Sequence, residues 1–242
     1  MLKMNESNYG ARDQADPSDQ LRNEITAFVP DPRSLMTVVR RSDGSTSMVT
    51  LAERHENIAS FELTAAVPAD IRVHFETSKN LYLYAWFVYR FHSVAEQQAL
   101  ATLEFALREC LGLRFPSFCG PSVKRSPGLS LLLGKARKEK LISNDGLRAR
   151  ERLALLRARD RASMARIQEM TEKGLTEMYY KESEIEPLPE DYAHDPLDVF
   201  EKTLPLLRNT YAHGDSMLHP TVLGTFEIVT DLVNQLYPEA AQ

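Results

Sequence analysis

The pattern of apolar positions predicts a mostly helical chain from Pro68 onwards. This proline suits the first position of a helix, and apolar residues then recur at helical spacing through Tyr89. Ser93 and Glu96 have the spacing of a capping box, which predicts that a second helix begins there. Its apolar stripe consists of Leu100, Leu103, Leu107 and Leu111. We expect Gly112 to end this helix.

Further helices are expected beyond a loop rich in proline and glycine at residues 114–128. The pattern predicts a short helix over 129–141 and a long charged helix over 146–173. After an acidic linker, Asp195 caps a helix whose first residue is Pro196. A last helix begins near Pro220. The fold class is therefore all-α, a helical bundle of about five to six helices.

The first quarter of the chain is less regular. Residues 1–33 carry many polar side chains and few large apolar ones, which predicts a mobile polar arm. Residues 34–67 form an ambiguous extension, because Asp43-Gly44 between two apolar runs indicates a hairpin, whereas residues 47–61 also suit a helix. We favour a helix for the later part. The bundle domain then spans residues 68–238.

The net charge, the cysteines and the apolar runs of the chain exclude several classes of function. The net charge of −5 makes attraction of the whole molecule to nucleic acid unexpected, so a polyanion would need a local basic patch. Cys110 and Cys119 form neither a disulfide framework nor a metal cluster, and no cofactor is expected. The longest apolar run, Leu81–Tyr89, is far shorter than the ~20 residues of a membrane span. The N-terminus lacks the apolar core of a signal peptide. We expect a cytoplasmic protein without membrane contact.

One segment, Arg208-Asn-Thr-Tyr-Ala-His213-Gly214, combines residue types suited to phosphate chemistry. A histidine whose pKa is near ~6.5 can donate or accept a proton at neutral pH. An arginine presents a planar fork of donors to phosphate oxygens. Asn209 shares a helix face with His213, whereas Arg208 lies about 140° away from it. The long Arg208 side chain would reach round to the same cleft.

The arginine, the polar residue directly after it and the histidine at the end of the penultimate helix resemble the motif of the HEPN superfamily. The resemblance covers about Pro68 to Pro238 as helical order and motif position. It implies a helical bundle that dimerises and places two Arg-His pairs in one cleft. Asp215 stands where some members carry an aromatic residue.

Active members of this superfamily cut RNA without a metal. The expected function is thus a metal-independent endoribonuclease, or an RNA binder, that acts as a homodimer in stress or defence. In the cleavage reaction the 2′-hydroxyl attacks the adjacent phosphorus and leaves a 2′,3′-cyclic phosphate. The expected catalytic residues are Arg208, Asn209 and His213. The alternative is a non-catalytic interaction or scaffold module with the same fold.

Two secondary sets of residues are candidates for the same chemistry. Glu104, if buried, could pair with Arg208 and fix its rotamer, although an exposed glutamate is the more usual case. Four arginines of the long helix lie within a narrow angular band and could follow an RNA backbone: Arg148, Arg152, Arg159 and Arg166. The alternative, which we favour, is a solvated charged face.

A third class of function is a binder of small ligands in the bundle core. Only the aromatic segment with Tyr82, Trp86 and Tyr89 supports it. The same side chains are expected as core residues, with a dimer surface as the second interpretation.

Overall fold

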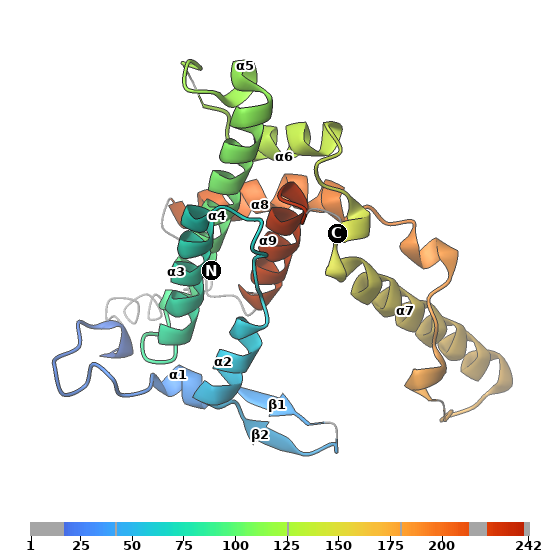
Figure 1. The fold of residues 1–242 in the computed structure, drawn as a ribbon. Helices are drawn as coiled ribbons and strands as arrows, with labels where there is room; N and C mark the ends of the chain where they lie inside the picture. Colours follow the sequence, from blue (N-terminus) through green and yellow to red (C-terminus); the bar gives the residue numbers. More distant parts are fainter. Residues whose placement is uncertain (1–16, 42, 125, 180, 213–221, 240–242) are drawn as a thin grey trace, which may run out of the picture.

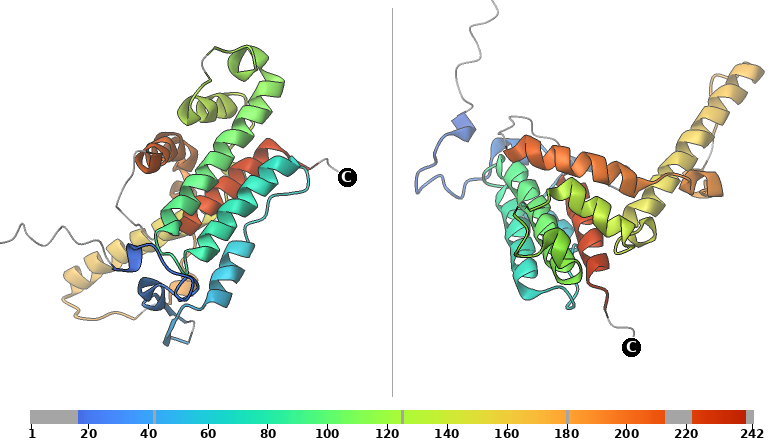
Figure 2. Two further views of the ribbon diagram at one scale, coloured as in Figure 1. Left: turned by 90° about the vertical axis from the view of Figure 1, so that its left-hand side faces the viewer. Right: turned by 90° about the horizontal axis from the view of Figure 1, so that it is seen from above.

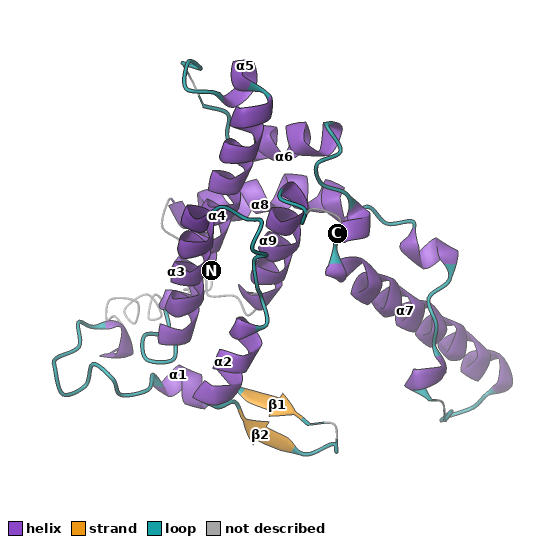
Figure 3. Ribbon diagram, viewed as in Figure 1, coloured by secondary structure: helices purple, strands orange, loops and turns teal. Residues whose placement is uncertain are grey.

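The structure, a computed structural model, describes residues 17–239 apart from residues 42, 125, 180 and 213–221 (Figure 1). This part of the chain is mostly helical, which confirms the all-α class (Figure 3). The expected bundle of five to six helices is not confirmed, because the described residues form nine α-helices, several of them short. The helices are α1 (Pro32–Leu35), α2 (Leu51–Ala59), α3 (Ala69–Tyr84), α4 (Phe91–Arg114), α5 (Pro116–Cys119), α6 (Leu129–Lys138), α7 (Arg148–Lys173), α8 (Pro196–Ala212) and α9 (Val222–Leu236). The strands are β1 (Val38–Arg40) and β2 (Thr46–Met48).

Helix α4 is the centre of the bundle and packs against both α3 and α9 (Figure 1). The leucine stripe predicted for this helix is completely buried: Leu100, Leu103, Leu107 and Leu111. Phe75 of α3 and Phe226 of α9 meet beside the stripe, with ring centres 5.7 Å apart. Each buried leucine or phenylalanine contributes about 1.5–3 kcal/mol of hydrophobic stabilisation. This core therefore fixes the position of α4, from which the site described below is built.

Helices α6 and α8 pack against each other and against α4. Four leucines of the two helices are buried: Leu132, Leu133, Leu197 and Leu204. Helix α8 begins as the sequence predicts, because the backbone N–H of Asp198 donates to Oδ1 of Asp195 at 3.0 Å. Arg137 of α6 donates to Glu201 of α8 at 2.8 Å. These apolar and polar contacts fix the position of α8 on the bundle.

Helix α7 projects away from the bundle (Figure 1; Figure 2, right). Its buried residues are three alanines in its first half: Ala149, Ala154 and Ala158. Most of its charged surface therefore faces solvent. It ends at Gly174, whose φ of 62° is the left-handed conformation that favours glycine. The segment expected as a linker returns along α7, where Arg161 pairs with Asp191 at 2.7 Å. No helix of the described ranges combines the length and the apolar character needed to cross a membrane.

The ambiguous extension contains both of the structures that its sequence allows. Strands β1 and β2 pair antiparallel with Val39 opposite Ser47, and Gly44 in the turn has a φ of 84°. Helix α2 follows directly, and Thr50 and Glu53 form a capping box at its start. The hairpin and the helix are thus consecutive elements, because the hairpin ends before the helical pattern begins.

The mobile polar arm expected over residues 1–33 is supported only in part, because the described end of this segment contacts the bundle. Asp31 is completely buried, and its backbone N–H donates to the Trp86 carbonyl at 3.0 Å. Its carboxylate pairs with Arg33, which also pairs with Asp19. These charge-assisted contacts, together with the edge-to-face contact of Phe28 with Phe87 at 6.1 Å between ring centres, attach this polar segment to the bundle. Residues 1–16 lie outside the described residues.

Candidate functional site

The arginine of the sequence motif lies in the last turns of α8. Arg208 is half-buried, and Asn209 directly after it is exposed. The Nη1 atom of Arg208 lies 3.4 Å from Oδ1 of Asn209, which makes a long hydrogen bond. His213 and Gly214 lie outside the described residues, so their positions relative to Arg208 stay a prediction.

A carboxylate on the central helix pairs with the motif arginine. Oε2 of Glu104 lies 3.3 Å from Nε of Arg208, and the Glu104 side chain is 12% exposed. Oε1 of the same carboxylate accepts a hydrogen bond from Arg108 at 2.5 Å. Of the two alternatives for Glu104, the structure thus has the paired carboxylate rather than the exposed one. Its two ion pairs compensate for the partial removal of this charge from water.

These side chains line a surface hollow of about 350 Å³ between α4, α6 and α8. Arg108, Arg208, Glu104 and Asn209 contribute its polar groups, and residues 128–131 with Pro205 complete its wall. We call it the Arg208 hollow. Two guanidinium groups and one carboxylate give it a local excess of one positive charge. Guanidinium forks in such a hollow are suited to binding phosphate oxygens.

A second glutamate of α4 joins three helices next to the motif. Glu96 is completely buried and accepts hydrogen bonds from Tyr211 of α8 and Thr225 of α9, both at 2.5 Å. The predicted capping box is wrong, because α4 begins at Phe91 and the Ser93 hydroxyl donates to the Arg90 carbonyl.

The sequence nevertheless carries a signal for the buried position of Glu96. It precedes Leu100 by four residues and Leu103 by seven, so it belongs to the buried stripe of α4. Tyr211 stands two residues before His213, and Glu96 therefore anchors the end of the motif helix to the core. Arg108, which the sequence did not nominate, carries no comparable signal, since one more arginine on a helix is ordinary.

The four arginines of α7 that were candidates for following an RNA backbone have different partners in the structure. Arg148 pairs with Asp231 of α9 at 2.6 Å, and Arg152 pairs with Glu227 of the same helix. Arg159 is exposed and Arg166 is half-buried, and both also interact with other groups. Within the described part of the chain, none of the four lines the Arg208 hollow. The beginning of this face is thus used to hold α7 against α9.

The described residues include no group of histidine, cysteine, aspartate and glutamate side chains that could hold a metal ion. Both cysteines are free thiols. Burial raises the pKa of the Cys110 thiol, which favours the unreactive protonated form.

No protein-family model matches the chain, and no curated protein or solved structure matches it either. The likeness to the HEPN superfamily accordingly rests on the segment Arg208–Gly214 and on the order of the helices around it.

Proposed function

We propose that this protein is a cytoplasmic, HEPN-like homodimer that cleaves or binds RNA in a stress or defence response. Its site would consist of Arg208, Asn209 and His213, with Glu104 as a positioning residue. The observation that carries the proposal is the placement of Arg208. Its guanidinium lines a surface hollow beside Asn209 and Arg108, and the Glu104 carboxylate holds it there.

The chemistry follows from the residue types. The 2′-hydroxyl of RNA attacks the adjacent phosphorus, the bond to the 5′-oxygen breaks, and a 2′,3′-cyclic phosphate and a 5′-hydroxyl result. Arg208 would stabilise the negative charge on the non-bridging oxygens. His213 would give a proton to the leaving 5′-oxygen, a role that the end of a helix favours because it stabilises protonated histidine. Asn209 would orient the imidazole from the same helix face.

The homodimer is part of the proposal because the resemblance implies two copies that share one cleft. Two exposed leucines close to the motif support a protein contact on this side of the molecule. Leu131, in the wall of the Arg208 hollow, is 63% exposed, and Leu206 of α8 is 66% exposed. Large apolar side chains this exposed are suited to burial in an interface.

The direct test is cleavage of single-stranded RNA by the full chain in the presence of EDTA. We expect Arg208→Ala and His213→Ala each to lower the rate by about 10³-fold or more. Both variants should keep the helical circular dichroism of the wild type. Lys202→Ala, at an exposed position of the same helix, is the matched control and should cleave normally. Equal cleavage by wild type, Arg208→Ala and His213→Ala would remove the motif from the mechanism.

A non-catalytic interaction module with the same fold is the second candidate. The Arg208–Glu104 ion pair favours it, because a guanidinium already paired with a carboxylate has fewer donors left for substrate. The exposed Leu131 and Leu206 also suit a protein partner. A wild-type protein that dimerises but leaves RNA intact would support this candidate over the first.

A further inference from the structure

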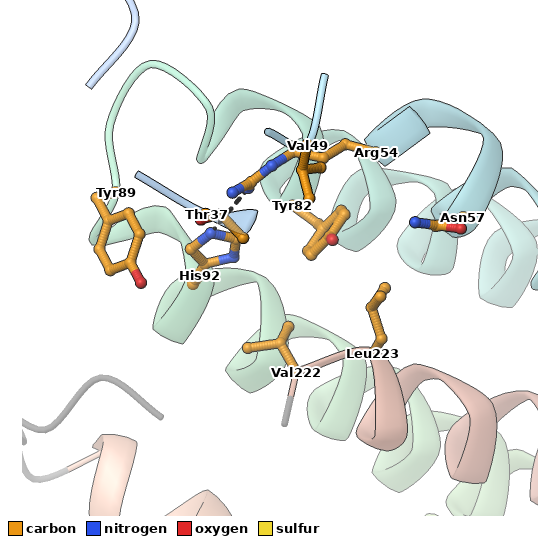
Figure 4. A pocket seen from close by; sticks show the side chains of 9 residues that line it. All are labelled: Thr37, Val49, Arg54, Asn57, Tyr82, Tyr89, His92, Val222 and Leu223. Carbon is orange, nitrogen blue, oxygen red and sulfur yellow. Dashed lines mark hydrogen bonds between the residues drawn. The ribbon is translucent and has the colours of Figure 1, made fainter. Parts of the chain in front are cut away.

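A second pocket lies at the other end of α4, where the hairpin, α2, α3 and α9 converge (Figure 4). Its volume is about 230 Å³. Tyr82, Val222 and Leu223 contribute apolar walls, and Arg54 and His92 contribute polar groups. We call it the Arg54 pocket. It shares no lining residue with the Arg208 hollow.

Arg54 is the unusual residue of this pocket, because it is a buried cation. It is only 5% exposed, and within the described residues no carboxylate forms an ion pair with it. Its charge instead lies over aromatic rings, with Cζ 5.2 Å from the ring centre of Trp86 and 6.0 Å from that of Tyr82. Burial lowers the pKa of its guanidinium. Buried charges are normally paired, so this arrangement lacks an anion.

The partner of Arg54 inside the protein is a neutral histidine. Nη1 of Arg54 lies 3.0 Å from Nε2 of His92, as the dashed line in Figure 4 marks. Because a guanidinium can only donate, Nε2 must be the acceptor, and the imidazole proton is then on Nδ1. Burial, together with the charge of Arg54, lowers the pKa of His92 to about 4, which keeps this ring neutral. Asp31, whose charge also acts on His92, is bound by Arg33.

Two donors of this pair are left unused. Nε of Arg54 and Nδ1 of His92 are buried, and neither has a hydrogen-bond partner in the described part of the chain. Both atoms carry a hydrogen, so only an acceptor can satisfy them. A negatively charged oxygen group would satisfy the donors and neutralise the buried charge at once.

We propose that the Arg54 pocket binds a small molecule in which a carboxylate or a phosphate group is attached to an apolar or aromatic body. The anionic group would bind Nε of Arg54 and Nδ1 of His92. The body would lie against Tyr82, Val222 and Leu223, which surround the space below Arg54 in Figure 4. The volume is below the ~300 Å³ at which pockets for drug-sized ligands begin, so the ligand is small. The proposal does not depend on RNA cleavage at the Arg208 hollow.

The test uses the full chain and four probes in thermal unfolding and titration calorimetry. Phenyl phosphate and benzoate carry the two anionic groups, phenol is the neutral analogue, and inorganic phosphate lacks the body. We expect one or both aromatic anions to raise the Tm by about 5–10 °C at a hundredfold excess over Kd. Phenol and inorganic phosphate should bind at least about tenfold more weakly. The tighter of the two aromatic anions identifies the anionic group.

Variants of the arginine separate binding from a purely structural role. Arg54→Met should abolish binding of the aromatic anions and raise the Tm of the ligand-free protein by about 2–4 °C, because it removes an unpaired buried charge. Arg54→Lys keeps the charge but not the planar fork and should weaken binding at least about tenfold. Arg72→Met, at an exposed position of α3, is the matched control and should bind normally.

Three results would overturn the proposal. They are no binding of either aromatic anion to the wild type, equal binding of phenol, or unchanged binding by both Arg54 variants. A lower Tm of ligand-free Arg54→Met together with no anion binding to the wild type would assign Arg54 to structure alone.

Discussion

The Arg208 hollow and the Arg54 pocket place an arginine in opposite electrostatic settings at two ends of one helix. Arg208 has a side chain that is 41% exposed and pairs with the carboxylate of Glu104. Arg54 is buried among aromatic rings and a neutral histidine, without a carboxylate in the described residues. Helix α4 carries the partner residue in both cases, His92 near its start and Glu104 in its second half.

The two settings suit the two arginines to different anions. In the hollow, the protein already supplies a counter-charge, and the guanidinium is positioned at the surface, where a large polyanion can reach it. In the pocket, the described residues bury the guanidinium without giving it a carboxylate partner, so a small anion would complete the site.

Glu96, between His92 and Glu104 on α4, connects the two regions because it binds both α8 and α9. Glu96→Ala should lower the free energy of unfolding by about 3 kcal/mol, since it leaves the hydroxyls of Tyr211 and Thr225 without their acceptor and opens a cavity. Urea unfolding measures the loss. Glu109→Ala, at an exposed position of the same helix, should change stability by less than about 0.5 kcal/mol. Similar stabilities of the two variants would show that Glu96 does not anchor the helices.

The Arg54 pocket should make stability sensitive to acid through His92. Its pKa falls from 6.5 to about 4 in the folded state. Above pH 6.5 the histidine is neutral in both states, and its contribution is complete. Between pH 6.5 and 4 the unfolded chain binds a proton that the folded chain does not, so stability falls. Since one pKa unit corresponds to about 1.4 kcal/mol, the loss approaches about 3 kcal/mol.

The check compares unfolding free energies of wild type and His92→Gln at pH 7 and pH 4. The variant should lose less stability over this range than the wild type does. His55→Gln, at an exposed position of α2, serves as the control and should follow the wild type. Parallel losses for wild type and His92→Gln would mean that His92 is not held neutral by burial.

The counter-charge of the Arg208 hollow should matter for activity more than for stability. If the proposed function holds, Glu104→Gln should lower kcat for RNA cleavage by about tenfold with little change in KM, because Arg208 is no longer held for the transition state. The free energy of unfolding should change by less than about 1 kcal/mol, as is usual for partly exposed ion pairs. Glu109→Gln is the matched control. An unchanged kcat of Glu104→Gln would show that Glu104 does not position Arg208 for cleavage.

Local patterns account for the parts of the fold that the sequence predicts well. The leucine stripe of α4, the glycine at the end of α7 and the Asp195 cap of α8 depend on neighbours within a few residues, and the structure contains all three. The docking of Asp31 was not predictable, because it depends on Trp86, more than fifty residues away. The spacing of Ser93 and Glu96 suits a capping box, but Glu96 instead accepts hydrogen bonds from Tyr211 of α8 and Thr225 of α9. These tertiary contacts cannot be predicted from local spacing.

The two sites differ in the same way. The sequence predicts Arg208, Asn209 and His213 as site residues because one segment carries all three. It also predicts Glu104 as a partner of Arg208 if Glu104 is buried. It did not nominate Arg54 or His92, because their pocket forms only where five separate elements meet. The aromatic segment with Tyr82, Trp86 and Tyr89 does point to this region, since Tyr82 and Trp86 are buried beside Arg54 and Tyr89 lines the pocket.

The product of RNA cleavage shows whether Arg208 and His213 catalyse attack by the 2′-hydroxyl. Phosphorus NMR of a dinucleotide incubated with the full chain and EDTA distinguishes a 2′,3′-cyclic phosphate from the intact phosphodiester and from a phosphate monoester. We expect a cyclic phosphate from the wild type and from Lys202→Ala, and intact dinucleotide from Arg208→Ala and His213→Ala. A phosphate monoester as the first product, or a cyclic phosphate formed equally by the Arg208→Ala and His213→Ala variants, would contradict this mechanism.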